Sequence, residues 1–97
     1  MKFNTKTIHG NQHHDPSTGA VMMPIYQTST FAQSSPGVHQ GYEYSRGANP
    51  TRSALEGALA SIENGTHGFA FGSGLAATDS VMKMLNPGDE IIAMDDL

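Results

Sequence analysis

The sequence contains no cysteine and no tryptophan, and only 5 of its 97 residues are Lys or Arg. Without cysteine, disulfide and thiolate chemistry are excluded within these residues. The net charge of −4 argues against nucleic-acid binding, since affinity for phosphate backbones depends on concentrated Lys and Arg. No apolar run approaches the roughly 20 residues of a membrane span, and the first ten residues lack the apolar core of a signal peptide. We therefore expect a cytoplasmic protein with no nucleic-acid or membrane partner.

The character of the chain changes near residue 49. Residues 1–48 have few apolar positions, no clear helical period, and many Gly, Ser, Thr, His and Asn residues. Their one apolar stretch, "VMMPIYQTSTF", contains Pro24, which suits an extended edge segment. Such a segment cannot form a core alone. We predict that residues 1–48 form an N-terminal arm lying on another part of its own chain or on a neighbouring subunit.

A helix is predicted from residue 49 onwards. Asn49 can cap its start, and Pro50 is a favoured first-turn residue. Large apolar residues then recur at helical spacing, and Asn64-Gly65 ends the pattern. The recurring apolar positions are Leu55, Leu59 and Ile62.

The remaining residues predict a strand, a second helix and another strand. "HGFAFGSG" is typical of a short strand entering a glycine-rich turn, "LAATDSVMKML" of a helix, and "EIIAM" of a buried strand. This order is that of an α/β protein with a parallel sheet. Two strands do not make a covered sheet, so we expect residues 49–97 to be the start of a larger domain. The alternative is a small domain that is complete at 97 residues.

The glycine-rich turn "FGSGLAA" could bind an anion. Backbone amides at a helix start have no internal partner and lie at the positive end of the helix dipole. Gly72 and Gly74 would let a ligand approach the backbone, and Ser73 could add a hydroxyl or cap the helix. The alternative is a tight turn that needs glycine. The turn matches neither the P-loop nor the dinucleotide-binding pattern.

The stretch "YEYSRGANPTR" offers a second anion-binding candidate. Tyr44 and Arg46 are two residues apart and would project to the same side of an extended segment. A guanidinium can bind two phosphate oxygens at once, and a phenol adds one hydrogen bond. The alternative is that Tyr44 packs and Arg46 forms a surface ion pair. We expect Arg52, inside the first turn of the helix, to be a structural charge.

The five histidines raise the question of a metal site. His13 and His14 are adjacent and precede Asp15, but adjacent side chains diverge, and no further ligands fall at a recognisable spacing. We predict no metal site. A metal-binding arm built on these histidines remains the weaker alternative.

Three separated motifs together resemble a known family. The stretches "TGAVMMPIYQTSTF", "GYEYSRGANPTRSALEGALASIENG" and "AFGSGLAATDSVMKMLNPGDEI" are similar to the N-terminal portion of the pyridoxal 5′-phosphate (PLP) enzymes of cysteine and methionine metabolism. This family includes cystathionine γ-lyase, cystathionine γ-synthase and methionine γ-lyase. The resemblance runs from about Thr7 to Leu97, with the motifs in the family order.

The resemblance implies a fold and a cofactor site. The fold would be type I: an N-terminal arm followed by the first part of a mostly parallel, helix-covered sheet. Tyr44 and Arg46 would reach the PLP phosphate of the neighbouring subunit, whereas the amides of Gly74 and Leu75, with Ser73 adjacent, would hold the phosphate of their own subunit. The active sites would be shared within a homotetramer arranged as a dimer of dimers.

The resemblance also implies what these residues lack. The family's aldimine lysine would lie beyond Leu97, because the lysines present, Lys2, Lys6 and Lys83, do not match it. No catalytic residue is therefore predicted within the chain, and residues 1–97 alone should be inactive.

Among the activities of the family, we predict transsulfuration by a carbon–sulfur lyase that cleaves the γ C–S bond of cystathionine to cysteine, 2-oxobutyrate and ammonia. Glu43 precedes Tyr44 as an acidic residue does in many cystathionine-handling members, and it could meet the distal ammonium of the substrate. It could equally be a surface charge. The alternatives are γ-synthase chemistry on activated homoserine, methionine γ-lyase chemistry, or a non-enzymatic phosphate-binding module.

Overall fold

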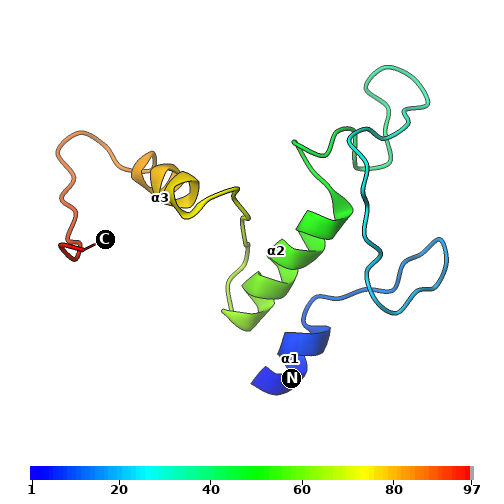
Figure 1. The fold of residues 1–97 in the computed structure, drawn as a ribbon, viewed down its shortest axis with the longest axis horizontal. Coiled ribbons are helices and arrows are strands. Elements are labelled where there is room, and N and C mark those ends of the chain that lie inside the picture. The colour runs from blue at the N-terminus through cyan, green and yellow to red at the C-terminus, as the bar shows by residue number, and fades with distance from the viewer. Residues whose placement is uncertain (97) are drawn as a thin grey trace.

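A computed structural model describes residues 1–96 as three helices joined by irregular chain (Figure 1). The helices are α1 (Phe3–His9), α2 (Pro50–Ile62) and α3 (Gly74–Met82). Two isolated antiparallel bridges, Thr30 with Tyr44 and Ser35 with Val38, are the β pairing of the described residues. None of the helices there is long and apolar enough to cross a membrane.

Helix α2 begins and ends where the sequence predicts. The Asn49 side chain accepts a hydrogen bond from the Thr51 amide at 2.9 Å, and Pro50 occupies the first turn. At the other end Asn64 adopts a left-handed backbone conformation with φ of 55°, and the Gly65 amide donates to the Ala60 carbonyl at 2.8 Å. The helix boundaries predicted from capping chemistry are confirmed.

Helix α1 is not predicted from the sequence, because residues 1–48 show no helical period. Its two large apolar side chains, Phe3 and Ile8, are both exposed, so no apolar face holds the helix. Polar contacts to α2 hold it instead. The Lys6 ammonium donates to the Ser61 carbonyl at 3.2 Å and to the Asn64 side-chain oxygen at 2.6 Å. A search for apolar periodicity does not detect a helix of this kind.

The face of α2 that carries small residues is covered by the chain after α1, whereas the leucines of α2 are exposed to solvent. Ala60, which is 8% exposed, lies on the face toward α1, where Gly57 meets the Asn11 side chain. A Cβ atom at Gly57 would overlap the amide end of that side chain, so the absence of a Cβ atom lets Asn11 approach α2 closely. In contrast, Leu55 and Leu59 are 51% and 47% exposed. The apolar face predicted from the sequence exists, but within residues 1–96 nothing covers it fully.

The arm folds back over the start of α2. The Phe31 amide donates to the Glu43 carbonyl at 3.0 Å, and the Ser45 amide donates to the Ser29 carbonyl at 2.9 Å. The Tyr26 amide donates to the Thr51 hydroxyl at 2.9 Å. The arm therefore lies on a later part of its own chain, at the start of α2.

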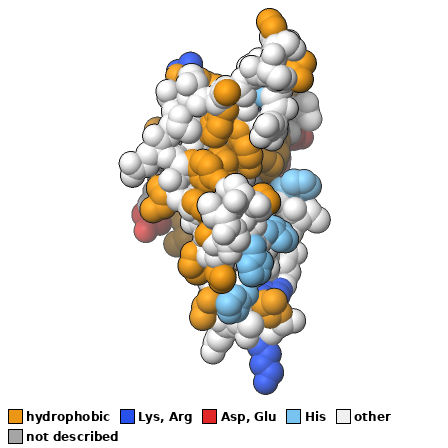
Figure 2. Space-filling model, turned by 90° about the vertical axis from the view of Figure 1, so that its right-hand side faces the viewer, with side chains coloured by type: hydrophobic (Ala, Val, Ile, Leu, Met, Phe, Trp, Pro, Cys, Tyr) orange, Lys and Arg blue, Asp and Glu red, His pale blue; other side chains and the backbone are white. Residues whose placement is uncertain are grey.

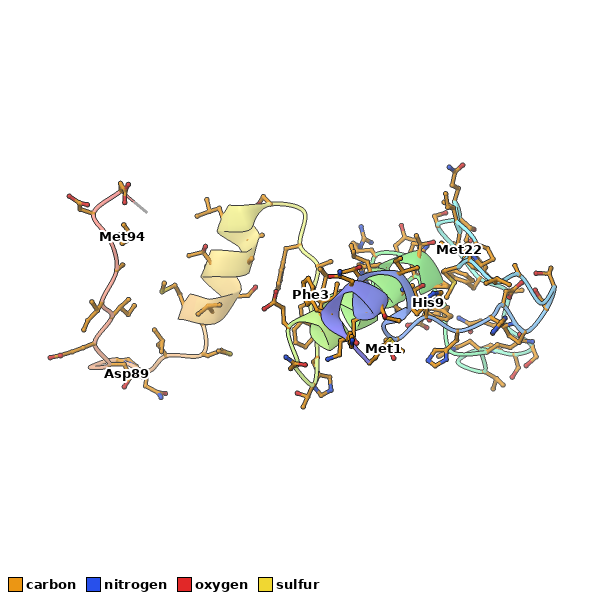
Figure 3. The ribbon with its side chains drawn as sticks, turned by 90° about the horizontal axis from the view of Figure 1, so that it is seen from below. Met1, Phe3, His9, Met22, Asp89 and Met94 are labelled. Carbon is orange, nitrogen blue, oxygen red and sulfur yellow. The ribbon has the colours of Figure 1, made fainter. Side chains whose placement is uncertain are left out.

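Helix α3 confirms the second predicted helix, whereas the two predicted strands do not form among residues 1–96. The segments around Phe69 and Ile92 are unpaired, and both side chains point largely into solvent. A strand exists only when a neighbouring strand takes up its backbone hydrogen bonds, and these two segments are separated by α3 and do not pair. The predicted part of a sheet is thus absent from the described residues. Figure 3 shows α3 and the segment with Asp89 and Met94 extending away from the other helices.

The molecule is open. Its radius of gyration is 17.3 Å, whereas a compact domain of this length has about 12.5 Å. The accessible surface is 8089 Å², against about 5,400 Å² for a compact protein of this mass. Hydrophobic side chains gather at the surface of the arm, beside a row of histidines (Figure 2). The described residues therefore do not enclose a core of their own.

Candidate functional site

The start of α3 offers free backbone amides. The Ser73 hydroxyl accepts a hydrogen bond from the Ala76 amide at 3.1 Å and so caps the helix. Within residues 1–96, the amides of Gly74 and Leu75 have no acceptor. A Cβ atom placed on Gly72 or Gly74 would meet nothing within 4 Å. The helix start is therefore open to solvent, and its dipole and amides favour an anion.

Tyr44 and Arg46 lie side by side, as predicted, although for a different reason. The Arg46 guanidinium carbon lies 5.0 Å from the centre of the Tyr44 ring, a cation–π contact. The prediction of an extended segment is wrong, because the amides of Gly47 and Ala48 both donate to the Tyr44 carbonyl, at 3.0 and 2.9 Å. These bonds form a turn. We call residues 44–47 the tyrosine–arginine turn.

The positive charge of Arg46 on the tyrosine–arginine turn is available to bind a ligand. Arg46 and Tyr44 are exposed, and within residues 1–96 the Arg46 guanidinium makes no hydrogen bond or ion pair. Glu43 is also exposed; its backbone carbonyl binds the Phe31 amide, while its carboxylate contacts no partner in the described part of the chain. A cation and a carboxylate are thus both exposed within one surface loop.

The two candidate anion-binding groups do not meet within the chain. The tyrosine–arginine turn lies at the start of α2, whereas α3 contacts neither α1 nor α2 in the described residues. Figure 1 shows α3 apart from α2 and from the loop ahead of it. One chain therefore presents its two candidates at separate places.

Asn49 holds the tyrosine–arginine turn in place, a role that the sequence does not reveal. Besides capping α2, its amide nitrogen donates to the Tyr26 carbonyl at 3.1 Å and to the Ser45 hydroxyl at 2.9 Å. The Ser45 hydroxyl in turn donates to the Thr28 carbonyl. A capping residue is detectable from the sequence, but the second use of its side chain depends on the folded arm.

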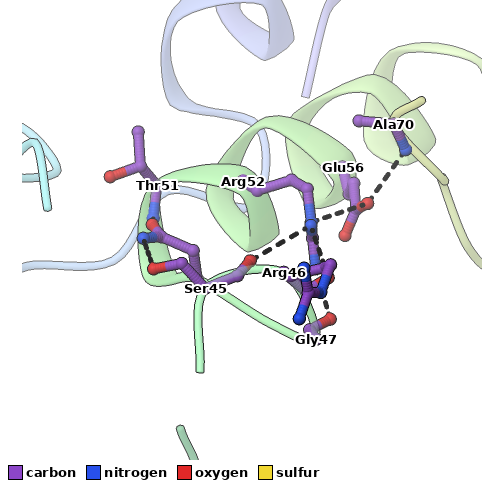
Figure 4. A network of polar contacts seen from close by, with 8 residues as sticks. Ser45, Arg46, Gly47, Thr51, Arg52, Glu56 and Ala70 are labelled. Carbon is purple, nitrogen blue, oxygen red and sulfur yellow. Dashed lines mark hydrogen bonds and ion pairs between the residues drawn. The ribbon is translucent and has the colours of Figure 1, made fainter. Parts of the chain in front are cut away.

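Arg52 is a structural charge, as predicted. Its guanidinium donates to the backbone carbonyls of the tyrosine–arginine turn, and its Nε lies 3.7 Å from a carboxylate oxygen of Glu56 (Figure 4). The same Glu56 oxygen accepts a hydrogen bond from the Ala70 amide at 2.9 Å. The sequence pattern suggests the helical ion pair but not the contacts to the turn.

The histidines do not form a metal site in the described residues, where no group of three or more metal-ligating side chains occurs. His13 and His14 instead line a cleft of about 530 Å³ with the aromatic residues Tyr26, Phe31 and Tyr42. Beside them Asp15 accepts hydrogen bonds from Thr18 and Ser17, and these bonds lower the pKa of its carboxyl. Asp15 therefore shapes a turn.

Known proteins resemble this chain along nearly its whole length. It is 60% identical over 95 residues to a cystathionine beta-lyase of Coxiella burnetii, spanning 98% of this chain and 24% of that protein. It is 52% identical over 95 residues to a probable cystathionine gamma-synthase of Herpetosiphon aurantiacus, spanning 98% and 30%. The crystal structure of cystathionine gamma-lyase from Lactobacillus plantarum, complexed with L-serine, matches with 50% identity and a TM-score of 0.79, over 92% of this chain and 23% of that one.

The chain thus spans about a quarter to a third of the length of these relatives. The structural match confirms the coarser fold prediction, that of a type I PLP-dependent enzyme. The model of the Cys/Met metabolism PLP-dependent enzymes matches residues 4–97. The chain therefore belongs to the family of Cys/Met metabolism PLP-dependent enzymes.

Proposed function

We propose that residues 1–97 form the N-terminal segment of a PLP-dependent enzyme that cleaves a carbon–sulfur bond of cystathionine, and that this segment anchors the cofactor phosphate. The observation that carries the proposal is the open helix start of α3, where unpaired amides of Gly74 and Leu75 follow the Ser73 cap. Family membership supports the phosphate of PLP as the anion that this helix start holds.

The residues present fit a phosphate dianion. Two amides and the positive end of the helix dipole face open space, and the absence of side chains at Gly72 and Gly74 leaves room for phosphate oxygens. The Ser73 hydroxyl accepts from the Ala76 amide, so its own proton remains available to a phosphate oxygen. When bound, PLP supplies an electron sink for reactions at the carbon atoms of the amino acid.

The tyrosine–arginine turn supplies a second set of donors. The Arg46 guanidinium can form two parallel charge-assisted hydrogen bonds to phosphate oxygens, and the Tyr44 hydroxyl can add one more. The Tyr44 ring below the guanidinium restricts its orientation. Donors held in this way keep the cofactor in one position during the reaction.

These donors serve the site of a neighbouring identical subunit in this proposal. Support comes from the single chain, in which the exposed turn lies apart from the start of α3. In this proposal a second chain brings Arg46 to the phosphate bound at the helix start. We propose a homotetramer, a dimer of dimers in which each site combines residues of two subunits.

The bond that is cleaved distinguishes the members of the family. We propose cleavage at the γ carbon, giving cysteine, 2-oxobutyrate and ammonia, with the exposed Glu43 carboxylate positioned for the distal ammonium of cystathionine. Cleavage at the β carbon would give homocysteine, pyruvate and ammonia. The 60% identity to a cystathionine beta-lyase favours this second candidate.

Product analysis separates these reactions. The full-length protein that contains residues 1–97 is purified with PLP and supplied with L-cystathionine, and the oxo acid is identified by mass. We expect 2-oxobutyrate with cysteine. Pyruvate with homocysteine would replace the γ-lyase proposal by the β-lyase, and cystathionine formed from activated homoserine and cysteine would replace it by a γ-synthase.

A non-enzymatic phosphate-binding module is the rival of another class. A PLP enzyme that binds its cofactor covalently shows an absorbance band in the visible region, which free phosphate binding does not produce. Titration of the full-length protein with PLP should therefore yield this band together with cystathionine turnover. Phosphate binding without either signal would reject the enzymatic proposal.

A further inference from the structure

The guanidinium of Arg52 is bonded to the backbone on which Arg46 stands. One terminal nitrogen donates to the carbonyls of Ser45 and Arg46, each at 3.4 Å, and the other donates to the Gly47 carbonyl. Figure 4 shows these contacts converging on one side chain. Three successive carbonyls of the tyrosine–arginine turn thus point toward Arg52, which fixes the position from which the Arg46 side chain extends.

The same side chain connects to the segment ahead of α3 through Glu56. One carboxylate oxygen of Glu56 lies 3.7 Å from the Arg52 Nε and accepts from the Ala70 amide at 2.9 Å. The backbone also passes close to α2 here, because a Cβ atom on Gly68 would overlap the Glu56 carbonyl. Ala70 precedes Ser73 by three residues. Arg52 and Glu56 therefore connect both candidate phosphate-binding segments of the chain.

The geometry of Arg52 is not that of an ordinary surface ion pair. The side chains of Arg52 and Glu56 are only 33% and 23% exposed, and the guanidinium has four partners. The pair of Lys83 with Asp79 has the same spacing on α3, but its side chains are 73% and 57% exposed and its ammonium has one partner. Exposed pairs of that kind contribute little to stability. The planar guanidinium of an arginine can donate to several carbonyls at fixed positions, whereas the ammonium of a lysine cannot reproduce this geometry.

We propose that Arg52 is a positioning residue for binding of the PLP phosphate. Through the carbonyls of residues 45–47 it fixes Arg46, which serves the neighbouring subunit's site, and through Glu56 it fixes the segment ahead of α3, which serves its own site. This inference rests on the proposed function, because the ligand is the PLP phosphate. Arg52 does not touch the phosphate itself. It acts by fixing the backbone from which the phosphate donors are presented.

The test compares Arg52→Lys with wild type in the full-length protein. The cofactor is removed by dialysis, PLP is titrated back, and the dissociation constant, the melting temperature of the cofactor-free protein and kcat at saturating PLP are measured. Lysine keeps the charge and the ion pair but loses the fork. We expect PLP to bind about tenfold more weakly, the effect of losing roughly one charge-assisted hydrogen bond. We also expect only a small decrease in the melting temperature, because the lost carbonyl contacts belong to one loop, and a kcat restored at saturating PLP.

Two further variants make the result specific. Glu56→Gln keeps an acceptor for the Ala70 amide and leaves Arg52 on its carbonyls, so its PLP affinity should fall less than that of Arg52→Lys. Lys83→Met removes an ion pair of the same spacing from α3 and serves as the matched control, with wild-type PLP affinity.

The outcomes separate this inference from the proposed function. If wild type binds PLP and Arg52→Lys binds it equally well, the inference is overturned while the function stands. The inference is also overturned if the variant melts earlier without cofactor and its kcat stays low at saturating PLP, because Arg52 would then act on folding alone. A wild-type protein that does not bind PLP overturns the function and the inference together.

Discussion

At the scale of single residues, Arg46 is an exposed cation and the side chain proposed to bind the phosphate. Its guanidinium is held over the Tyr44 ring and is otherwise unpaired within residues 1–96. Lysine at this position keeps the charge but loses the second parallel hydrogen bond to a phosphate. We therefore expect Arg46→Lys in the full-length protein to weaken PLP binding by about 1.5 kcal/mol, roughly tenfold.

Fluorescence titration of the cofactor-free protein with PLP measures this effect. Arg46→Met, which also removes the charge, should bind more weakly still. Tyr44→Phe keeps the ring below the guanidinium and removes only the phenolic hydroxyl, so it should weaken PLP binding less than Arg46→Met does. The control is Lys83→Met, which removes a charge outside the proposed site and should bind PLP as wild type does. Equal PLP affinity in wild type and Arg46→Met would show that Arg46 has no part in the phosphate site.

Asp15 gives a second prediction at this scale. Hydrogen bonds from the Thr18 and Ser17 hydroxyls, at 2.5 and 2.7 Å, lower the pKa of this carboxyl from its usual 3.8. Because the folded-state pKa is the lower one, the ionised carboxylate stabilises the fold above about pH 4, and this contribution is lost as the pH falls through the folded-state pKa. Asp15→Asn removes the titrating group.

Thermal melting of the full-length protein between pH 5 and pH 3 measures this contribution. The wild-type melting temperature should fall more steeply toward low pH than that of Asp15→Asn. If the melting temperatures of the two proteins fall equally with pH, the hydroxyl contacts of Asp15 do not stabilise its ionised form over its protonated form.

At the scale of elements, the start of α2 depends on one side chain with two functions. The Asn49 oxygen caps the helix, while its nitrogen holds Tyr26 and Ser45. Asn49→Asp keeps an excellent cap and loses both donors. The helix should therefore persist, whereas the unpaired Tyr26 carbonyl should lower the free energy of unfolding by roughly 1–3 kcal/mol.

Far-UV circular dichroism and denaturant titration of the full-length protein test whether the cap and the donors to the arm contribute separately. Asn49→Asp should retain the helical signal and unfold at a lower denaturant concentration, and Asn49→Ala, which also loses the cap, should be less stable than Asn49→Asp. Wild-type stability in Asn49→Asp would show that the donors to the arm contribute nothing.

The same elements show which parts of the fold can be predicted from the sequence. Helix α2 and the cap of α3 follow from local chemistry, in which Asn49, Pro50 and Ser73 satisfy amides within a few residues. Helix α1 escapes prediction because Lys6 holds it by contacts with residues 55 and 58 positions away. The predicted strands do not form because a strand requires a neighbouring strand to pair with, and the local sequence of a segment does not provide that partner.

The candidate site also contains residues whose roles can be predicted from the sequence and residues whose roles cannot. Ser73, Gly74 and Leu75 are predictable because a helix start exposes its amides wherever it occurs. The pairing of Tyr44 with Arg46 is predicted, but its cause is a turn rather than extended chain. The support from Arg52 depends on three carbonyls of that turn, so it becomes visible only after folding.

At the scale of the whole molecule, the exposed apolar surface is the main feature. Leu55 and Leu59 on α2 and Leu75 on α3 are about half exposed or more, and the accessible surface of 8089 Å² far exceeds that of a compact chain. We expect residues 1–97 produced alone to bind the dye ANS, to melt without a cooperative transition and to show no cystathionine cleavage.

Dye fluorescence and calorimetry check this expectation, with the full-length protein as the control. The full-length protein should melt cooperatively and bind little dye. A sharp calorimetric transition and low dye binding for residues 1–97 alone would instead indicate an independently folding domain.

The arm's contacts with the start of α2 also determine when this region can assemble during synthesis. The bonds that join Tyr26 to Asn49 and Thr51 close loops of only 23 and 25 residues. Loops of this length cost modest entropy, and the N-terminal part of a chain folds while the rest is still being translated. The support for the tyrosine–arginine turn can therefore form on the ribosome soon after Thr51 emerges, before any partner chain is available to meet it.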